Sequence, residues 1–444
     1  MLKDTIVAQA TASGKSGINI IRISGSDSLK IAQKIFYNKD FKCNIKNNVM
    51  YFGNINLGLT KDVGYCVYFK APKSFTGEDV VEFHCHGGYQ VSKTLIERCL
   101  ECGARLASPG EFSKRAFLNG KMTLDQAEGV IDLINAETEG QMRAGNNLAH
   151  GDLYKKISFY QEKLTDILSE IEVNLDYPEH DIEYETKENI KVKLVEILND
   201  IEKLLTTEKT GRIIKNGIDI AIVGRTNVGK SSLLNALINF DQAIVTDVEG
   251  TTRDVINASI EYKGIKFNFY DTAGLRETTD KIEKIGIEKS KQLQKNCDII
   301  IYVFDGSKKL SEEEQEILGS SNKNQINIIN KNDSLLEDNK NKNAIYISAK
   351  NKNNIEDIKE KIYEIVLKNH NESNNFMLTN ARHVEVLKEC KNMLEMSIEN
   401  IENVTLDCVA LDAKSIWEKL GEITGNTATD IIIDKIFSKF CLGK

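Results

Sequence analysis

The stretch that decides the fold is Ile218 to Asn235, IDIAIVGRTNVGKSSLLN. Its apolar start, Ile218 to Val223, predicts a buried strand, and Ser231 to Ile238 has the apolar spacing of a helix. The turn between them, Gly224 to Ser231, fits the phosphate-binding pattern GxxxxGK[ST]. Glycines let successive N–H groups point at one anion, and the dipole of the following helix adds to the attraction. Strand, loop and helix in this order predict a nucleotide-binding α/β domain.

Within this loop, Lys230 would reach the β- and γ-phosphates of a nucleotide, and the Ser231 hydroxyl would ligate Mg²⁺. Further along, Asp271 to Gly274 (DTAG) follows an apolar-alternating strand, Lys266 to Tyr270. The aspartate can hold Mg²⁺ through water, and the Gly274 N–H can sense the γ-phosphate. The nucleotide contacts predicted from these two motifs are Asn227, Val228, Gly229, Lys230, Ser231, Ser232, Asp271, Thr272, Ala273 and Gly274.

Two later motifs indicate which base is bound. Asn330 to Asp333 (NKND) ends a predicted strand, Ile326 to Ile329, and Ser348 to Lys350 (SAK) follows another. The Asp333 carboxylate can accept hydrogen bonds from the N1–H and the exocyclic amine of guanine, which adenine cannot offer. The predicted base-side contacts are Asn330, Lys331, Asn332, Asp333, Ser348, Ala349 and Lys350. Four motifs in this order are typical of a Ras-like GTPase domain, so we expect GTP as the ligand.

Composition limits the remaining possibilities. The chain has 444 residues, enough for several domains, and a formal charge of −8, which argues against a broad basic surface. Nucleic acid would therefore be met locally or through a partner. The nine cysteines show no paired CxxC spacing, the N-terminus does not resemble a signal peptide, and no apolar run is long enough for a membrane span. We expect a cytoplasmic protein with reduced thiols.

Residues 1–120 are predicted to form an α+β unit. Its expected strands are Thr5 to Ala10, Ile18 to Ser24, Val63 to Phe69 and Asp79 to His84, and its expected helices are Asp27 to Phe36 and Val91 to Cys102. His84-Cys85-His86 would place two histidines on one strand face, but no further ligands lie at zinc spacing, which favours a structural or pocket-lining role. The PGEF and LNGK pieces within Ser108 to Lys121 are predicted to be turns.

From Thr123 onward the apolar spacing becomes helical. Amphipathic helices are expected at Asp152 to Asn174 and Lys187 to Thr206, separated by an acidic connector, Asp176 to Glu185. Further helices are expected at Phe376 to Asn403 and Ala413 to Phe440. These late helices lack a core of their own, so we predict a GTPase domain inserted into one helical domain. The expected domains are residues 1–120, 121–211 (first helical half), 212–373 (GTPase) and 374–444 (second helical half).

This combination resembles the MnmE (TrmE) family of bacterial tRNA-modification GTPases over the entire chain. The matching motifs are DTIVAQAT at Asp4, RISG at Arg22, SFTGEDVVE, PGEFSKRAFLNGK, LDQAE, GTTRD, DTAGLRE and the terminal CLGK. The resemblance implies a multidomain protein with an N-terminal α+β domain like folate-binding domains, a discontinuous helical domain and an inserted Ras-like P-loop GTPase domain. It also implies that the N-terminal domain mediates homodimerisation.

The resemblance further implies a function. Family members act with an FAD-dependent partner, MnmG (GidA), and install an aminomethyl or carboxymethylaminomethyl group at carbon 5 of the wobble uridine of certain tRNAs. The one-carbon unit comes from a tetrahydrofolate derivative, 5-formyl- or methylene-tetrahydrofolate. Carried over by motif, the folate contacts are Arg22, Glu82, Lys121 and Lys444. A carboxylate suits the guanidine-like edge of a pterin, and cations suit its glutamyl tail. The choice of Glu82 over Glu78 rests on alignment within a short run.

Hydrolysis of GTP needs groups that the Ras pattern does not supply here, because Leu275 replaces the water-orienting glutamine. The resemblance implies that Glu283 orients the water; without the resemblance, Glu283 would be taken for a solvated helix residue. It implies that K⁺ takes the place of an arginine finger, held by Asn227, Thr246, Val248 and Thr251, with Thr252 as a second Mg²⁺ ligand. The loop contacts to GTP would be Thr246, Asp247, Val248, Glu249, Gly250, Thr251 and Thr252.

Three questions stay open from the sequence. Cys441 could be a nucleophile for the one-carbon unit or a small side chain that closes the pocket. The GTPase segment alone also fits a regulatory GTPase of ribosome assembly, a binding switch, although the N-terminal unit and the CLGK end argue against this. A folate-dependent transferase that works without a partner, with GTP only structural, is the other alternative.

Overall fold

The computed structural model describes residues 4–176, 180–240, 258–271, 297–320, 322, 324–339, 341–367 and 376–443. The chain divides into two units. Unit 1 comprises Met1–Ile131, Asn147–Ile197 and Glu389–Lys444, and unit 2 comprises Asp132–Asn146 and Leu198–Lys388. Each unit is therefore assembled from segments that are distant in the sequence.

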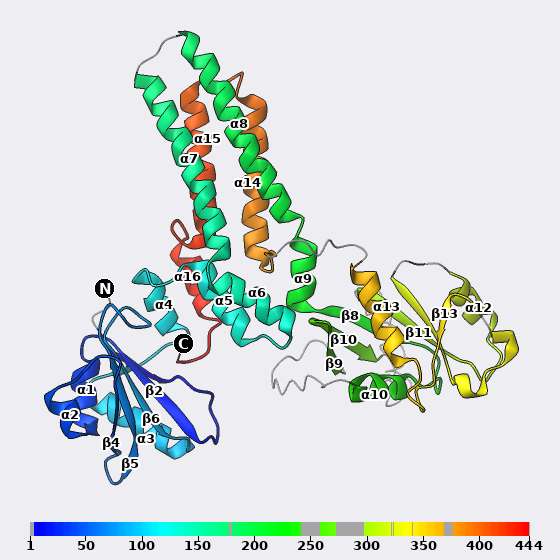
Figure 1. Ribbon diagram of the computed structural model, residues 1–444, viewed down its shortest axis with the longest axis horizontal. Coiled ribbons are helices and arrows are strands. Elements are labelled where there is room, and N and C mark those ends of the chain that lie inside the picture. The colour runs from blue at the N-terminus through cyan, green and yellow to red at the C-terminus, as the bar shows by residue number, and fades with distance from the viewer. Residues whose placement is uncertain are drawn as a thin grey trace, which may run out of the picture. The chain divides into compact units, whose positions relative to one another are not determined.

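Unit 1 contains a seven-stranded sheet in the order β3-β4-β5-β6-β2-β1-β7 (Figure 1). Neighbouring strands are antiparallel, except that β1 and β7 are parallel. The pairing of β2 with β6 places Arg22 opposite Glu82 and Ile20 opposite His84. The strands are β1 (Ile6–Gln9), β2 (Ile18–Ser24), β3 (Phe36–Tyr37), β4 (Met50–Asn56), β5 (Lys61–Phe69), β6 (Val80–His86) and β7 (Arg105–Leu106).

Alternating burial separates the two faces of this sheet. Apolar side chains such as Ile21, Ile23 and Phe83 pack on one face against helices α1 (Ser28–Ile35) and α3 (Tyr89–Glu101). The opposite face carries Arg22 and Glu82. Helix α4 (Glu111–Leu118) covers part of that face, because its Phe112 packs with Ile6 and Ala8 of β1. A short helix, α2 (Lys39–Cys43), follows β3.

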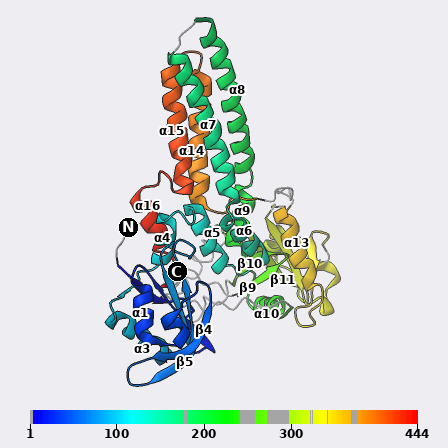
Figure 2. The same cartoon turned by 60° about the vertical axis from the view of Figure 1, so that its left-hand side comes forward.

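The helical part of unit 1 joins segments from both sides of the phosphate-loop region. Helices α7 (Asp152–Asp176) and α15 (Leu406–Thr424) pack along each other, and α8 (His180–Leu205) and α14 (Ala381–Asn400) run alongside in both views (Figures 1 and 2). The buried side chains between them include Leu164, Ile167, Ile190, Leu194, Leu394, Ile416 and Leu420. The predicted discontinuous helical domain is thus confirmed. Helix α16 (Asp430–Phe437) also belongs to unit 1, α9 (Glu208–Asn216) belongs to unit 2, and α5 (Leu124–Ile134) and α6 (Glu139–Ala149) each contain residues of both units.

Unit 2 contains a six-stranded sheet in the order β13-β12-β11-β8-β10-β9, parallel except for β9. Helices α10 (Lys230–Phe240) and α13 (Ile355–Leu367) pack on one face, and α12 (Glu312–Gly319) packs on the other with Phe304 and Ile329. This doubly wound arrangement confirms the predicted P-loop α/β domain. The strands are β8 (Ile218–Val223), β9 (Ala258–Tyr262), β10 (Ile265–Asp271), β11 (Ile299–Asp305), β12 (Gln325–Asn330) and β13 (Ala344–Tyr346), and two 3₁₀ turns span Asn332–Ser334 and Glu337–Asn339.

Several predicted boundaries were wrong. Helix α8 begins at His180, inside the expected acidic connector, since acidic residues are favourable in the first turns of a helix. The helix expected at Ala413 to Phe440 is two helices, and Gly425, with φ +94°, ends the first of them, α15. The PGEF and LNGK pieces are only partly turns, because Glu111, Phe112 and Leu118 belong to α4. Strand β4 was not predicted.

Among the described helices, none combines the length and the apolarity that crossing a lipid bilayer requires.

Candidate nucleotide site and candidate folate site

The phosphate loop, residues 224–231, joins the carboxyl end of β8 to α10. Two of its glycines are required by space: a Cβ on Gly224 would collide with the Val303 carbonyl oxygen, and a Cβ on Gly229 would collide with the Asn330 amide. Asn227 has φ +64°, the left-handed region that asparagine tolerates better than most residues. The loop therefore fits tightly between β11 and β12, as a rigid anion cradle must.

Lys230 opens α10 and turns its side chain back over the loop. Its Nζ donates to the carbonyl oxygens of Gly224 at 2.9 Å and Arg225 at 2.8 Å, and the residue is buried. The ammonium thus lies over the curve of the backbone where a phosphate would be held. Ser231 follows on the first turn of the same helix, the position from which its hydroxyl could ligate a metal ion.

Asn330, at the end of β12, links two of the predicted nucleotide loops. Its amide nitrogen donates to the Val228 carbonyl oxygen at 2.9 Å, and its amide oxygen accepts from the Ala349 N–H at 3.0 Å. One buried amide therefore ties the phosphate loop to the SAK segment. The motif match marked Asn330 as a contact to the nucleotide, whereas in this structure its side chain bridges two loops.

Lys331 and Asp305 form a second link beside the loop. Lys331 Nζ lies 2.7 Å from Asp305 Oδ2 and 3.4 Å from the Asn227 carbonyl oxygen. Burial tends to raise the pKa of Asp305, but hydrogen bonds from Lys331 and Ser307 outweigh it and lower that pKa. Asp305 was not predicted as part of the site. Its position at the end of the apolar strand β11 was the available signal.

Asp333 is exposed and held in place by its neighbours. Ser348 Oγ donates to Asp333 Oδ1 at 2.7 Å, and Ser334 Oγ donates to Oδ2 at 3.3 Å. The hydrogen bond from Ser348 is the main reason that the pKa of Asp333 is lowered. The carboxylate is thus ionised at neutral pH and available as an acceptor. Asn332 and Lys350 flank the two residues on the same loops.

Further predicted contacts lie at the end of β10, in the sequence before β9 and after β10, and at the last residue. Asp271 ends β10 beside Ile222, next to the phosphate loop, but its side chain is not described. The following predicted residues lie outside the described residues: Thr246, Asp247, Val248, Glu249, Gly250, Thr251, Thr252, Thr272, Ala273, Gly274, Glu283 and Lys444.

In unit 1, the predicted folate contacts Arg22 and Glu82 are paired across β2 and β6. Arg22 Nε lies 2.8 Å from Glu82 Oε1, and the guanidinium lies 5.3 Å from the Phe75 ring centre and 5.8 Å from that of Phe112. His84 Nε2 is 3.5 Å from Glu82 Oε2. Burial tends to raise the pKa of Glu82, but His84 and Arg22 outweigh it and lower that pKa. The pair is therefore surrounded by the His84 imidazole and by two aromatic rings, those of Phe75 and Phe112.

An ionic cluster around the buried Arg115 side chain lies beside this pair and was missed in the sequence. We call it the Arg115 cluster; its members are Asp4, Glu78, Arg105, Glu111 and Arg115. Arg115 is 2% exposed, and its guanidinium lies 2.9 Å from Asp4 Oδ1, 3.1 Å from Glu78 Oε2 and 2.9 Å from Glu111 Oε1. Arg105 bridges Asp4 and Glu111 from the other side. The i,i+4 spacing of Glu111 and Arg115 was the available signal.

The two candidate glutamates have different partners. Glu78 is bound by Arg115 and by the Ser24 hydroxyl at 2.7 Å. Glu82 contacts Arg22 through one carboxylate oxygen and His84 through the other. Lys121 lies close to Gly77, whose Cβ would be 3.4 Å from the Lys121 side chain. Arg22, Glu82 and Lys121 thus flank the loop of residues 74–79.

The C-terminal segment lies within unit 1, against the sheet. A Cβ on Gly443 would collide with the carbonyl oxygen of Gln9 in β1, and the Gly110 N–H donates to the Cys441 carbonyl oxygen at 3.4 Å. The Cys441 residue is exposed. Gln9 is the neighbour of Ile21 in β2, one residue before Arg22. The CLGK segment therefore contacts β1 through Gly443.

The histidines of the HCH run have carboxylate partners. His86 Nδ1 is 2.5 Å from Asp62 Oδ1, and His84 contacts Glu82 as described. Within the described part of the chain, no group of three or more His, Cys, Asp or Glu side chains is arranged to hold a metal ion.

Comparison with known proteins adds the last line of evidence. The profile of the MnmE helical domain matches residues 124–441, and that of the GTP-binding protein TrmE N-terminus matches residues 5–121. The tRNA modification GTPase MnmE of Clostridioides difficile is 43% identical over 458 residues, which cover 100% of both chains. The proteins of that name from Lactobacillus gasseri and Pediococcus pentosaceus are each 40% identical and cover 99% of this chain and 98% of their own.

Proposed function

The chain belongs to the MnmE family of tRNA-modification GTPases, and from this premise we propose that it hydrolyses GTP to drive the modification of the wobble uridine of certain tRNAs. The observation that carries the proposal is the junction at Asn330, which ties the phosphate loop to the SAK loop at the carboxyl ends of β8 and β12. That edge is where doubly wound sheets bind nucleotides.

Preference for guanine is supported by Asp333. Its carboxylate is ionised and held by Ser348, while its exposure leaves it able to accept from a base. Two acceptor oxygens match the two donors of guanine, and adenine would leave them unpaired. The Ala349 N–H donates to the Asn330 side chain, and this hydrogen bond fixes the SAK backbone where it would line the base pocket.

The donor groups fit the ions that the family uses. Ser231 offers a hydroxyl oxygen at the start of α10, and Thr252 would add a second, which suits Mg²⁺. Asn227 offers an amide oxygen beside the loop, and the oxygens of Thr246, Val248 and Thr251 would complete an all-oxygen set for K⁺. Bound there, the cations would counter phosphate charge as the guanidinium of an arginine finger does in other GTPases. Glu283 is proposed to orient the attacking water.

The folate proposal rests on unit 1. Glu82 is ionised and would accept from the guanidine-like edge of the pterin of 5-formyl- or methylene-tetrahydrofolate, and the exposed ring of Phe75 offers an aromatic surface. Arg22 would hold Glu82 in place, while Lys121 and Lys444 would meet the glutamyl tail. Cys441 is exposed on the segment that reaches β1, so either a chemical or a pocket-closing role fits it.

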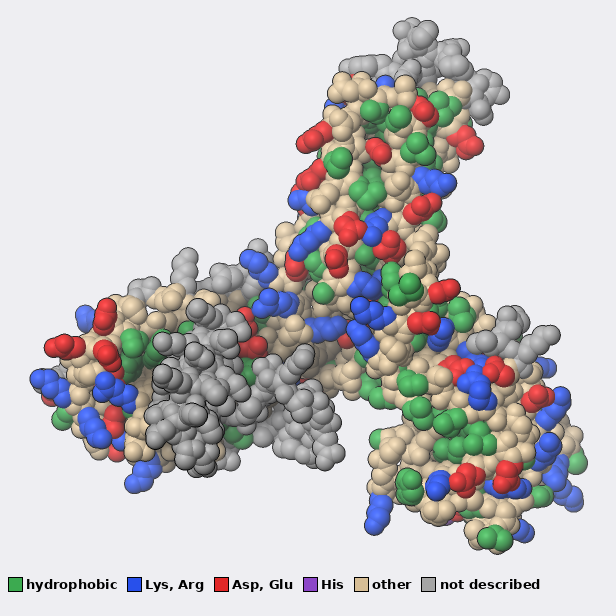
Figure 3. All heavy atoms as spheres, turned by 180° about the vertical axis from the view of Figure 1, so that it is seen from behind, with side chains coloured by type: hydrophobic (Ala, Val, Ile, Leu, Met, Phe, Trp, Pro, Cys, Tyr) green, Lys and Arg blue, Asp and Glu red, His purple; other side chains and the backbone are tan. Residues whose placement is uncertain are grey.

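Partners follow from the family and from exposed surface. The sheet face opposite α1 and α3 exposes apolar side chains, which supports homodimerisation through the N-terminal domain. These are Ile18, Met50, Phe52, Val63 and Tyr65. Figure 3 shows hydrophobic side chains gathered on one face of this domain among charged ones. We propose the FAD-dependent MnmG as second partner, tRNA contact partly through it, and a cytoplasmic location.

The length of the match separates this proposal from a ribosome-assembly switch. Resemblance to such a switch would be confined to the GTPase segment, whereas the relatives above cover 99–100% of this chain. The N-terminal profile match at residues 5–121 indicates a further domain, which the binding-switch function alone does not require.

The proposal is tested by Lys230→Ala in cells that lack the native protein. Losing the buried ammonium should lower GTP hydrolysis by about 10²–10³-fold and leave the wobble uridine unmodified. The matched control is Lys263→Gln, a lysine on the β9–β10 turn that pairs with Glu360 at 2.7 Å. Wobble-uridine analysis by mass spectrometry reports the outcome. Parental hydrolysis by the Lys230 variant, or normal modification in cells lacking the protein, contradicts the proposal.

A further inference from the structure

We propose that the α5–α6 corner, residues 132–141, holds the starts of the two strands whose ends bind the nucleotide, and thereby couples nucleotide state to the helical domain. The inference rests on the proposed GTP site and concerns its regulation. Strands β8 and β10 are parallel neighbours, from Ile218 beside Phe267 to Ile222 beside Asp271. Their carboxyl ends lead into the phosphate loop and the DTAG motif. The amino end of β10 contacts the corner directly, and that of β8 is joined to it through helix α9.

The corner is fixed to the β9–β10 hairpin by close contacts. Lys266, at the start of β10, forms an ion pair with Glu137, and the Glu139 N–H donates to Glu261 Oε1 at 3.0 Å. Gly140 lies directly on the hairpin turn, because a Cβ there would collide with the Gly264 carbonyl oxygen. An ion pair, a hydrogen bond and a backbone contact together leave the corner little freedom to slide over β10.

The corner is fixed to the start of β8 through helix α9. Lys215 in the last turn of α9 pairs with Asp132 at 2.8 Å, and Gln141 Nε2 donates to the Lys215 carbonyl oxygen at 2.8 Å. Gly217 then leads into β8, and a Cβ there would lie 2.5 Å from the Lys266 carbonyl oxygen. The two attachment points are therefore adjacent across the sheet.

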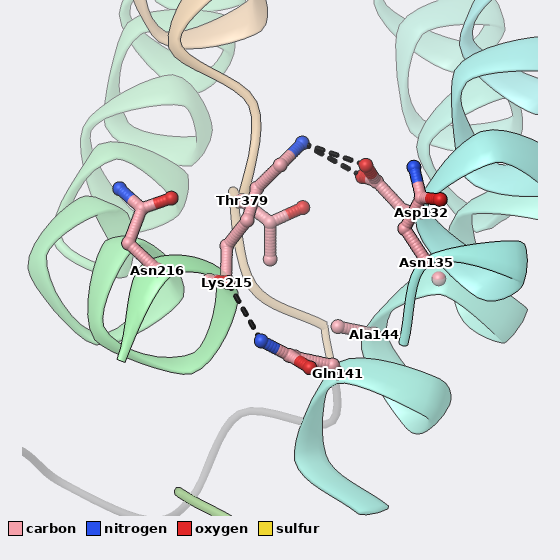
Figure 4. Close-up of a pocket in the computed structure, with 8 residues that line it drawn as sticks. Asp132, Asn135, Gln141, Ala144, Lys215, Asn216 and Thr379 are labelled. Atoms are coloured by element: carbon pink, nitrogen blue, oxygen red, sulfur yellow. Dashed lines mark hydrogen bonds and ion pairs between the residues drawn. The ribbon is translucent and has the colours of Figure 1, made fainter. Parts of the chain in front are cut away.

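The attachment to α9 is less tightly packed than the attachment to β10. A polar cavity of about 200 Å³ lies between the corner and the end of α9 (Figure 4). Its walls include Asp132, Asn135, Gln141, Lys215 and Thr379. At roughly 30 Å³ per water, a space of this size holds several molecules. The Lys215–Asp132 pair therefore has room to readjust, whereas neither Glu137 nor Lys266, which pair at the start of β10, lines this cavity.

Because the cavity lies only on the α9 side, we expect the corner to move with β10 and relative to α9. A strand is nearly inextensible at about 3.3 Å per residue, so a shift at Asp271 reaches Lys266, roughly 16 Å away, with little loss. The corner then follows β10 while the cavity absorbs the movement relative to α9. Helices α5 and α6 continue from the corner along the chain, so they are the elements that such a shift would turn. The coupling is reciprocal: if nucleotide binding changes the affinity of the helical domain for a partner by some factor, that partner changes the affinity for the nucleotide by the same factor.

Hydrogen–deuterium exchange of the full-length protein tests the coupling, comparing GDP with the analogue GppNHp. We expect exchange in residues 132–146 to differ between the nucleotides in the parent. Glu137→Lys and Lys266→Glu should each abolish that difference while the phosphate-loop response stays, and the double swap should restore it. Glu360→Gln is the control, because it removes an ion pair of the same hairpin that does not reach the corner.

Gly140→Ala provides an independent variant, since its methyl group forces the corner off Gly264 without changing charge, and it should also abolish the difference. If residues 132–146 do not respond in the parent although the phosphate loop does, or if the single variants keep the response, the coupling is refuted. If the phosphate loop itself does not respond to GppNHp, the nucleotide-site proposal fails first and the coupling falls with it.

Discussion

The two candidate sites of this protein are built in opposite ways. In unit 2, the phosphate loop is one continuous segment of residues 224–231, and its shape is set by the strand before it and the helix after it. In unit 1, Arg22 and Glu82 are 60 residues apart, and Arg115 and Asp4 are 111 apart. The Lys114–Asp434 ion pair spans 320 residues. The first site is local in sequence, whereas the second exists only when distant segments have packed.

This difference predicts different failures. A substitution in a local loop on a sheet of buried strands should impair function, because it removes one contact to the ligand, and should leave the fold intact. A site assembled around a buried ionic cluster is sensitive to the fold, because removing one partner leaves an uncompensated buried charge. Changes in unit 2 should therefore act on chemistry, and changes in the Arg115 cluster should act on stability. The predictions below separate these cases.

The largest effect is expected from removing residues 441–444, which should eliminate tRNA modification and leave GTP hydrolysis nearly intact. Gly443 packs on Gln9 of β1, so the deletion removes a segment from the folate site, while Phe437 and Phe440 stay buried in unit 1. Steady-state hydrolysis and wobble-uridine analysis check the two halves of the prediction. Normal modification by the shortened protein would remove the terminus from the site. Cys441→Ser then distinguishes a thiol that reacts from one that fills space.

Asp333→Asn should change the base preference without affecting the fold. The amide offers a donor where guanine has its exocyclic amine, so xanthine nucleotides, with a carbonyl there, become better ligands. Sites built on such hydrogen bonds discriminate by roughly 10⁴-fold, and a change of that order in the GTP-to-XTP ratio is expected. Competition binding with labelled GDP measures it. Ser334→Ala is the matched control, because its 3.3 Å contact only supports the carboxylate. An unchanged ratio excludes Asp333 from the base site.

Arg115→Met should destabilise unit 1 by about 1–3 kcal/mol, because Glu78 and Glu111 lose a buried hydrogen-bond donor, although Arg105 still pairs with Asp4 and Glu111. Trp417 in α15, the single tryptophan of the chain, reports unfolding of unit 1 in urea. Nucleotide binding by unit 2 should be retained at low urea. Lys114→Met is the control: its partner Asp434 is 63% exposed, so the loss should stay below about 1 kcal/mol. Equal effects of the two substitutions would refute the distinction between the sites.

The same contrast explains what could be predicted from sequence. The phosphate loop, NKND and SAK were recognised because each is contiguous and lies at a strand end, where the apolar pattern is strongest. The role of Asn330 as a bridge was not, because it depends on Val228 and Ala349 meeting in space. The Arg115 cluster was missed for that reason: its members come from β7, α4 and two loops.

Helix boundaries failed where local signals conflicted. The acidic residues that begin α8 looked like a solvated connector, although acidic side chains favour the first turn of a helix. The break after α15 depends on Gly425 adopting φ +94°. Glycine adopts this conformation readily, but its presence in a sequence does not show that it will do so at a given position. The contact of Gly443 with β1 was not predicted, because nothing in a four-residue terminus indicates where it packs; the family resemblance implied only a folate contact at Lys444.

The smallest effect concerns pH, and it refines the account of unit 1. Hydrogen bonding to Arg105 lowers the pKa of Asp4, and Arg105 and Arg115 lower that of Glu111 against the opposing effect of burial. A carboxylate with a lowered folded-state pKa stabilises the fold above its unfolded pKa, and this contribution is lost as pH falls through the folded pKa. Unit 1 should therefore lose stability below about pH 4.5. In Arg115→Met those pKa values should rise toward ordinary ones, so the urea midpoint reported by Trp417 should depend less steeply on pH. An identical slope in parent and variant would mean that Arg105 alone sets the acid response, and that Arg115 stabilises unit 1 by packing rather than by charge.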